Sequence, residues 1–172
     1  METNFFGAVK VTREFLPILR AQRRGAIVNI SSLAGQLSTA GLGSYSASKF
    51  ALEGMSEALA HEMKPFGIKV LIVEPGAFRT AFAGKAMRHM PVIDAYERVL
   101  GSERSILLGI DERQEGDPLK AARAIEIALE AEDTPLRLPL GRNAVSSIRA
   151  HAKVLLAELA KWESVAAETE YS

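Results

Sequence analysis

Residues 26–30 read AIVNI, and this short run decides the fold. Its side chains are mostly apolar and β-branched, Gly25 opens it, and two serines follow it, a pattern that predicts a strand buried on both faces of a sheet. A second such run, IKVLIVEPG, covers residues 68–76 and stops at a Pro-Gly pair, and a shorter one, LRLPLG, covers residues 136–141. We therefore expect three strands.

Helical patterns separate these strands. Asp117 followed by Pro118 gives one of the helices a strong start signal, because aspartate caps helices and proline suits their first position. Strands that alternate with helices predict βαβ crossovers and a parallel sheet with helices on both sides. Helices are expected over four stretches, at residues 3–22, 46–65, 117–131 and 143–165.

The predicted architecture is an α/β fold with a doubly wound parallel sheet, in a single domain over residues 1–172. Three strands are few for a sheet that is covered by helices on both faces. The chain also opens inside a helix, without the strand that should precede it in a βαβ series. We therefore expect an incomplete sheet that lacks its N-terminal strands.

Composition excludes several classes of protein. The 172 residues carry 21 basic and 21 acidic side chains, so the formal net charge is zero and no nucleic-acid or anionic membrane partner is indicated. There are no cysteines, which excludes disulfides and thiol catalysis. No leader peptide or apolar run of about 20 residues is evident, and we expect a cytoplasmic protein. The three histidines, His61, His89 and His151, lack metal-ligand spacing, so no metal site is predicted.

Three polar motifs follow the predicted strands. NISSLAG, residues 29–35, comes with the first strand, YSASK, residues 45–49, opens the next helix, and PGAFRT, residues 75–80, ends the second strand. Ser32 lies 13 positions before Tyr45, and Asn4 lies 28 positions before Ser32. Together these motifs resemble the short-chain dehydrogenase/reductase family over essentially the whole chain, and the resemblance implies an incomplete Rossmann-like fold.

The spacing of Tyr45 and Lys49 suits proton transfer to a carbonyl oxygen. A phenol has an ordinary pKa of about 10 and is a poor base near neutrality, so it must be tuned. A lysine one helical turn further on lies on the same face, and its charge favours the phenolate. The resemblance implies that Tyr45 is the general acid/base, that Lys49 lowers its pKa and holds the nicotinamide ribose, that Ser32 binds the substrate oxygen, and that Asn4 supports a proton-relay water. Ser31 competes with Ser32, but the family spacing favours Ser32.

The resemblance also implies a cofactor, NAD or NADP. Its nicotinamide half would be bound by Tyr45, Lys49 and the turn after the second strand, through Pro75, Gly76, Phe78 and Thr80. The glycine-rich turn that cradles the pyrophosphate in this family, and the residue that selects NAD or NADP, are not in this sequence. The substrate would be a small carbonyl compound or alcohol. Residues 81–116 resemble the family's substrate loop, although plain packing is an open alternative.

Two functions are therefore kept. The first is an NAD(P)-dependent oxidoreductase, and the alternative is a truncated, catalytically silent family member that acts as an oligomerising interaction module. We expect a homodimer or homotetramer in either case, because the first helix and the helix that follows Tyr45 resemble the pair that forms the family's four-helix interface. Their expected exposed apolar residues include Phe15, Phe50, Leu52 and Leu59.

Overall fold

A three-stranded parallel sheet forms the centre of the protein. The structure, a computed structural model, describes residues 1–82, 84, 87, 90–110 and 113–171. The strands are ordered β1-β2-β3, so the middle strand in sequence is also the middle strand in space. Ala26 pairs with Lys69 at one end of the first ladder, and Pro75 pairs with Leu140 at the end of the second. The strands are β1 (Ala26–Ile30), β2 (Lys69–Pro75) and β3 (Arg137–Leu140).

All four expected helices are present. The first begins as a π-helical turn, and the second begins three residues earlier than expected, so that Tyr45 lies inside it. One further helix, α3, lies within residues 81–116, the segment that resembles a substrate loop. The helices are η1 (Glu2–Gly7), α1 (Ala8–Gln22), α2 (Gly43–Met63), α3 (Glu97–Gly109), α4 (Pro118–Glu130) and α5 (Arg142–Ala167). Three short 3-10 turns are η2 (Leu33–Gly35), η3 (Lys64–Phe66) and η4 (Asp94–Tyr96).

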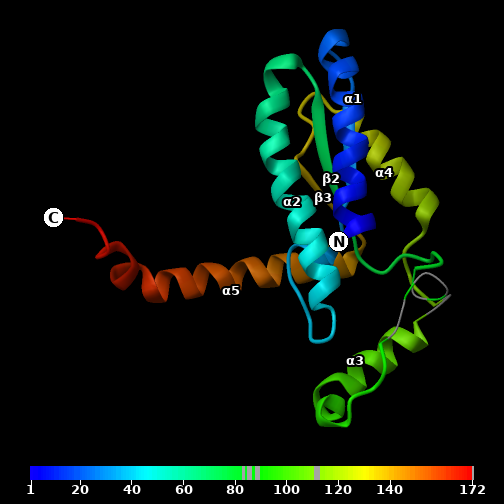
Figure 1. The fold of residues 1–172 in the computed structure, drawn as a ribbon, viewed down its shortest axis with the longest axis vertical. Helices are drawn as coiled ribbons and strands as arrows, with labels where there is room; N and C mark the ends of the chain where they lie inside the picture. Colours follow the sequence, from blue (N-terminus) through cyan, green and yellow to red (C-terminus); the bar gives the residue numbers. More distant parts are fainter. Residues whose placement is uncertain (83, 85–86, 88–89, 111–112, 172) are drawn as a thin grey trace.

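Helices cover both faces of the sheet. α1 and α2 lie on one face and α4 lies on the other (Figure 1). Strand β2 is buried from Val70 to Glu74, as expected for a strand between two layers of helices. One core joins α2 to the sheet through Leu59, Met63, Ile68 and Val70, and the other joins α4 to it through Leu71, Val73, Ala128 and Leu140. The predicted doubly wound parallel fold is confirmed.

Strand β1 differs from the prediction that both of its faces are buried. It pairs with β2 and with no other strand in the described part of the chain, so it lies at an edge of the sheet. Ile30 is consequently 50% exposed, and a groove of about 560 Å³ runs between α1 and β1. The apolar composition of AIVNI was correctly taken as strand, but burial on both faces also requires neighbours that this sheet does not have.

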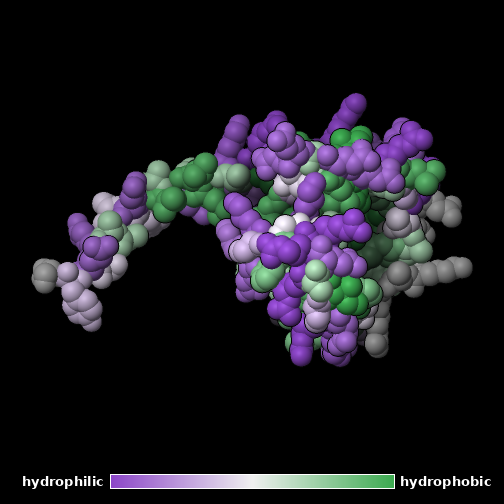
Figure 2. Space-filling model, turned by 90° about the horizontal axis from the view of Figure 1, so that it is seen from above, coloured by the Kyte–Doolittle hydropathy of each residue, from purple (hydrophilic) through white to green (hydrophobic). Residues whose placement is uncertain are grey.

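The exposed apolar surface also differs from the expectation. Phe15 on α1 and Phe50 on α2 are exposed, but Leu52 and Leu59 are buried at 2% and 5% because they face the sheet. Helix α5 leaves the body of the protein after its first turns (Figure 1), and hydrophobic side chains lie along this projecting helix (Figure 2). They are Val154, Leu155, Leu156, Leu159, Trp162 and Val165. No helix among the described residues is long and apolar enough to cross a membrane.

Candidate active site

A cavity of about 810 Å³ lies at the carboxyl ends of the strands, where open α/β sheets bind ligands. It is bounded by the end of β2, the start of α2, the loop after β1, and α3 and α4. The structure brings every residue that the sequence analysis singled out to this cavity. These residues are Asn4, Ser32, Tyr45, Lys49, Pro75, Gly76, Phe78 and Thr80.

Tyr45 and Lys49 lie one turn apart on α2 and face the same way. The Lys49 ammonium lies 5.8 Å from the centre of the Tyr45 ring and donates a hydrogen bond of 2.8 Å to the carbonyl oxygen of Ile30. Burial lowers the pKa of Lys49, and the nearby carboxylate of Glu53 raises it in part. Burial raises the pKa of Tyr45, and the Ser32 side chain opposes that rise. The phenol therefore holds its proton while the protein is without a cofactor.

The loop after β1 aims Ser32 at the phenol. Ser32 caps the short η2 turn, and its Oγ accepts a hydrogen bond of 3.1 Å from the backbone N–H of Ala34. The Ser31 side chain lies on the other side, next to Gly35 and Glu53, and its hydroxyl is buried without a hydrogen-bond partner among the described residues. Of the two serines, Ser32 is thus the one whose side chain lowers the pKa of Tyr45.

Asn4 reaches the cavity from the π-helical turn η1. Its Nδ2 donates to the Ser48 hydroxyl at 3.1 Å, and that hydroxyl donates to the backbone carbonyl of Tyr45 at 2.6 Å. The side-chain amide of Asn4 therefore binds the first turns of α2 rather than Lys49. It links η1 to the helix that carries the tyrosine and the lysine.

The turn after β2 is held by Gly116 and Gln114, for which the sequence analysis predicted no such role. Phe78 forms an isolated parallel β-bridge with Gly116, in which Gly116 N–H donates to Ala77 O at 3.1 Å and Arg79 N–H donates to Gly116 O at 2.9 Å. A Cβ on Gly116 would lie 2.6 Å from the Phe78 ring and 2.7 Å from Ala77 O, so this position requires glycine. The Arg79 guanidinium also donates to the carbonyl of Gln114 at 3.2 Å.

Two amide side chains at this turn were also missed. Gln114 and Asn143 both line the cavity, and Gln114 is 4% exposed. The Asn143 amide packs so closely on Gly76 that a Cβ there would clash with it. No local pattern in the sequence brings Gln114 and Asn143 to this turn, because both reach it from segments far along the chain.

The segment at residues 81–116 contributes the apolar wall of the cavity. The Phe82 ring lies 5.3 Å from the Tyr45 ring, and α3 adds Leu107 and the exposed Ile106. Positions 83, 85–86, 88–89 and 111–112 of this segment, His89 included, lie outside the described residues. Within the described ranges, no cluster of three metal-ligating side chains occurs.

Comparisons with known proteins agree with this fold. Residues 1–91 match the short chain dehydrogenase family. The chain belongs to this family of oxidoreductases. It is 36% identical over 165 residues to "Oxidoreductase BOA17" of Botryotinia fuckeliana, which covers 96% of this chain and 60% of that protein.

Solved structures give the same result. A short-chain dehydrogenase from Streptomyces avermitilis superposes with a TM-score of 0.88 at 49% identity, covering 96% of this chain and 60% of the other. A short-chain dehydrogenase from Burkholderia cenocepacia, solved in complex with NADP, shares the fold with a TM-score of 0.68 at 24% identity, over 94% of this chain and 56% of the other. The chain thus spans about 60% of the length of the relatives it matches.

Proposed function

We propose that this site transfers hydride between a nicotinamide cofactor, NAD or NADP, and a small carbonyl compound or secondary alcohol. The observation that carries the proposal is that one cavity at the strand ends contains Ser32, Tyr45 and Lys49. Ser32 lowers the pKa of the Tyr45 phenol, and Lys49 lies on the same face of α2 as Tyr45. Membership in an oxidoreductase family and an NADP-bound fold neighbour support it. We further propose that the protein works in the cytoplasm as a homo-oligomer.

The cavity fits the nicotinamide half of such a cofactor. Lys49 gives one hydrogen bond to Ile30 O, and an ammonium has three donors, so further donors are free for ribose hydroxyls. The turn from Pro75 to Thr80 would hold the nicotinamide. Gln114 lines the same cavity, and its buried Oε1 has no hydrogen-bond partner in the described part of the chain. When bound, the nicotinamide supplies or accepts the hydride.

The residues of this chain would handle the proton. Tyr45, whose pKa is raised by burial, holds a proton at neutral pH and can give it to a carbonyl oxygen. Ser32 donates a hydrogen bond to the same oxygen and keeps it oriented toward the phenol. The positive charge of Lys49 then stabilises the phenolate that remains. In the alcohol-oxidising direction the same groups act in reverse.

The silent interaction module remains the alternative function, but none of the observations favours it over catalysis. A truncated member without catalytic use would have no need to keep Asn4, Ser32, Tyr45 and Lys49 around one cavity. The proposal does not choose between NAD and NADP, because the cavity residues assigned a role would hold only the nicotinamide half of the cofactor.

The test is oxidation of NADH or NADPH, at millimolar cofactor concentrations, by an active form of the enzyme in the presence of a panel of aliphatic and aromatic ketones. We expect Tyr45→Phe to lower turnover by about 10²- to 10⁴-fold, because it removes the proton-transfer group. Tyr171→Phe, at a fully exposed tyrosine, is the matched control and should leave turnover unchanged. Turnover of Tyr45→Phe within tenfold of the parent would show that the phenol is not the acid/base.

A further inference from the structure

Two carboxyl groups are buried side by side behind the loop that carries Ser32. Glu53 on α2 is 4% exposed and Glu74 on β2 is 1% exposed. The Nε2 of Gln36 donates to both of them, at 2.8 Å to Glu74 Oε1 and 3.2 Å to Glu53 Oε2. One amide nitrogen therefore lies between two acidic side chains from different elements.

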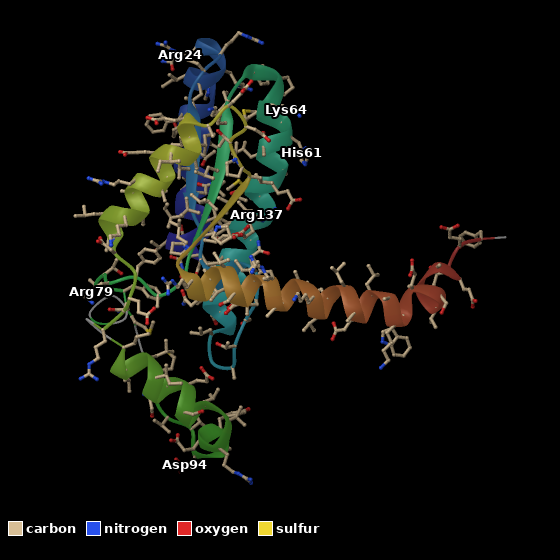
Figure 3. All side chains as sticks on the ribbon, turned by 180° about the vertical axis from the view of Figure 1, so that it is seen from behind. Arg24, His61, Lys64, Arg79, Asp94 and Arg137 are labelled. Atoms are coloured by element: carbon tan, nitrogen blue, oxygen red, sulfur yellow. The ribbon has the colours of Figure 1, made fainter. Side chains whose placement is uncertain are left out.

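The charges around this pair do not balance if both groups are ionised. Arg137, which extends from β3 toward α2 (Figure 3), lies 3.0 Å from Glu53 Oε2 and 3.6 Å from Glu74 Oε1. The same guanidinium also binds Glu57 at 2.6 Å, so one cation faces three carboxyl groups. Lys49, the other cation near Glu53, donates to a backbone carbonyl.

Burial favours the neutral form of one of the two acids. Two carboxylates in one desolvated site cannot both ionise at low cost. Burial and the charge of Glu53 raise the pKa of Glu74 to about 7, with Gln36 and Arg137 opposing that rise. The second oxygen of Glu53, Oε1, is also buried and has no hydrogen-bond partner among the described residues. That oxygen lies beside Gly35, and the two acids instead share the contacts of Gln36 and Arg137 at Glu53 Oε2 and Glu74 Oε1.

The pair connects the segments that form the cavity. Glu53 follows Lys49 by one turn of α2, and Glu74 directly precedes Pro75 at the start of the nicotinamide turn. Gln36 ends the η2 turn that Ser32 caps. A change in the charge of the pair therefore acts on both sides of the cavity at once.

We propose that Glu53 and Glu74 share one proton in the folded protein, and that this proton positions the Ser32 loop and the turn at Pro75 against Tyr45 and Lys49. When the proton leaves to water above neutral pH, the two carboxylates repel each other and the two segments shift. Glu53 and Glu74 are thus positioning residues, which need not touch the substrate. Their use in catalysis rests on the proposed function, but the shared proton does not.

The test is a titration of the purified chain followed by nuclear magnetic resonance, with ¹³C-labelled glutamate and ¹⁵N-labelled backbone. We expect one glutamate carboxyl to titrate near pH 7, against about 4.3 for an ordinary glutamate. The amides of Ser32, Gln36 and Gly76 should shift with the same midpoint. Glu74→Gln should remove both effects. Glu57→Gln, which changes a carboxylate on the same arginine but at the exposed side, should leave both in place.

Two further measurements test the proposal even if Glu74→Gln does not fold. Glu53→Gln removes the repelling charge and should move the remaining titration to lower pH. In the parent, the folded pKa of Glu74 lies above its unfolded value of 4.5, so the native state binds more protons between these values. The free energy of unfolding should therefore fall as pH rises from about 4.5 to about 7.

The proposal would be overturned if no glutamate of the unmodified protein titrated above about pH 6. It would also be overturned if the amide signals of Ser32, Gln36 and Gly76 did not shift with that titration. These outcomes are independent of catalysis. If the protein shows the titration but never oxidises NADH or NADPH, the proposed function is contradicted and the proposal of a shared proton is still supported.

Discussion

The ammonium of Lys49 and the carbonyl oxygen of Ile30 are joined by a hydrogen bond of 2.8 Å. This contact ties the helix that carries Tyr45 to the last residue of the edge strand β1, and it fixes the lysine beside the phenol, 5.8 Å from the ring centre. One residue thus connects the sheet, the proposed acid/base and the space proposed for the nicotinamide ribose.

Removing this lysine should harm both binding and chemistry. In an active form of the enzyme, Lys49→Ala should weaken NAD(P)H binding and lower turnover, because the ribose ligand and the charge that favours the phenolate are both lost. Tyr45→Phe should lower turnover alone. Fluorescence titration and initial rates separate the two effects, and Lys120→Ala on α4 serves as the control. Unchanged cofactor affinity in Lys49→Ala would contradict the ribose role.

The effect of Ser32 on the pKa of Tyr45 should be measurable in a titration of the phenol. Ser32 holds the pKa of Tyr45 below the value that burial alone would give, so Ser32→Ala should raise that pKa further. Phenolate absorbance against pH measures it, with Tyr45→Phe identifying the signal. Ser38→Ala in the same loop, where the hydroxyl binds Ser46, is the matched control. A Tyr45 titration that Ser32→Ala leaves unchanged would show that the serine does not act on the phenol.

Gly116 should tolerate no side chain, because a Cβ there meets Phe78 and Ala77 at 2.6 and 2.7 Å. We expect Gly116→Ala to lower the free energy of unfolding by about 1–3 kcal/mol, as overpacking does, and to displace the turn at Pro75. Gly54→Ala on α2 meets nothing within 4 Å and should be neutral or stabilising by up to about 1 kcal/mol. Urea unfolding of both variants measures the difference, and equal stabilities would contradict the prediction.

We expect the protein to self-associate through the exposed apolar faces of α1 and α2. Phe15 and Phe50 are 56% and 47% exposed, and exposed apolar side chains that form a contiguous patch mark interfaces. We expect a dimer or tetramer by sedimentation velocity, which Phe50→Glu should weaken. Val99→Glu on α3, equally apolar and exposed, should leave the assembly intact. A parent that sediments as a single monomeric species would contradict the prediction.

The sequence predicted those features that depend on local pattern. Glycines and prolines such as Gly25 and Pro75 punctuate the apolar runs, so the three strands were located to within a residue or two. The spacing of Tyr45 and Lys49 follows directly from helix geometry, and all eight candidate residues line one cavity.

The features that were missed depend on contacts between distant segments. Gly116 acquires its role only because it bridges to Phe78, 38 positions earlier in the chain. Similarly, Glu74 follows the apolar run Val70–Val73 in β2, and nothing in the sequence shows that it meets Glu53 and Arg137. The burial of β1 was overestimated because an apolar strand pattern does not reveal whether the strand lies at an edge.

Binding of the nicotinamide dinucleotide by these 172 residues should be weak. Much of the affinity of a dinucleotide comes from its pyrophosphate, which rests on a glycine-rich turn at a helix N-terminus, and from the next strand, which fixes the adenosine ribose. The sequence contains one run that imitates such a turn, GLGSYS at residues 41–46, but it does not directly follow a strand.

What the chain offers is the nicotinamide half of the site, built from Tyr45, Lys49 and the turn at Pro75. Among the described residues, the edge strand β1 pairs with β2 alone. The strand end that accepts the hydrogen bond from Lys49, at the Ile30 carbonyl, is therefore supported by one neighbouring strand rather than two. We therefore expect no saturable binding at micromolar concentrations when the purified chain is titrated with NADH and NADPH and followed by nicotinamide fluorescence or calorimetry. Micromolar affinity in this titration would show that the cavity alone holds the cofactor, or that a second copy of the chain completes it, and repeating the titration with Phe50→Glu would distinguish those two cases.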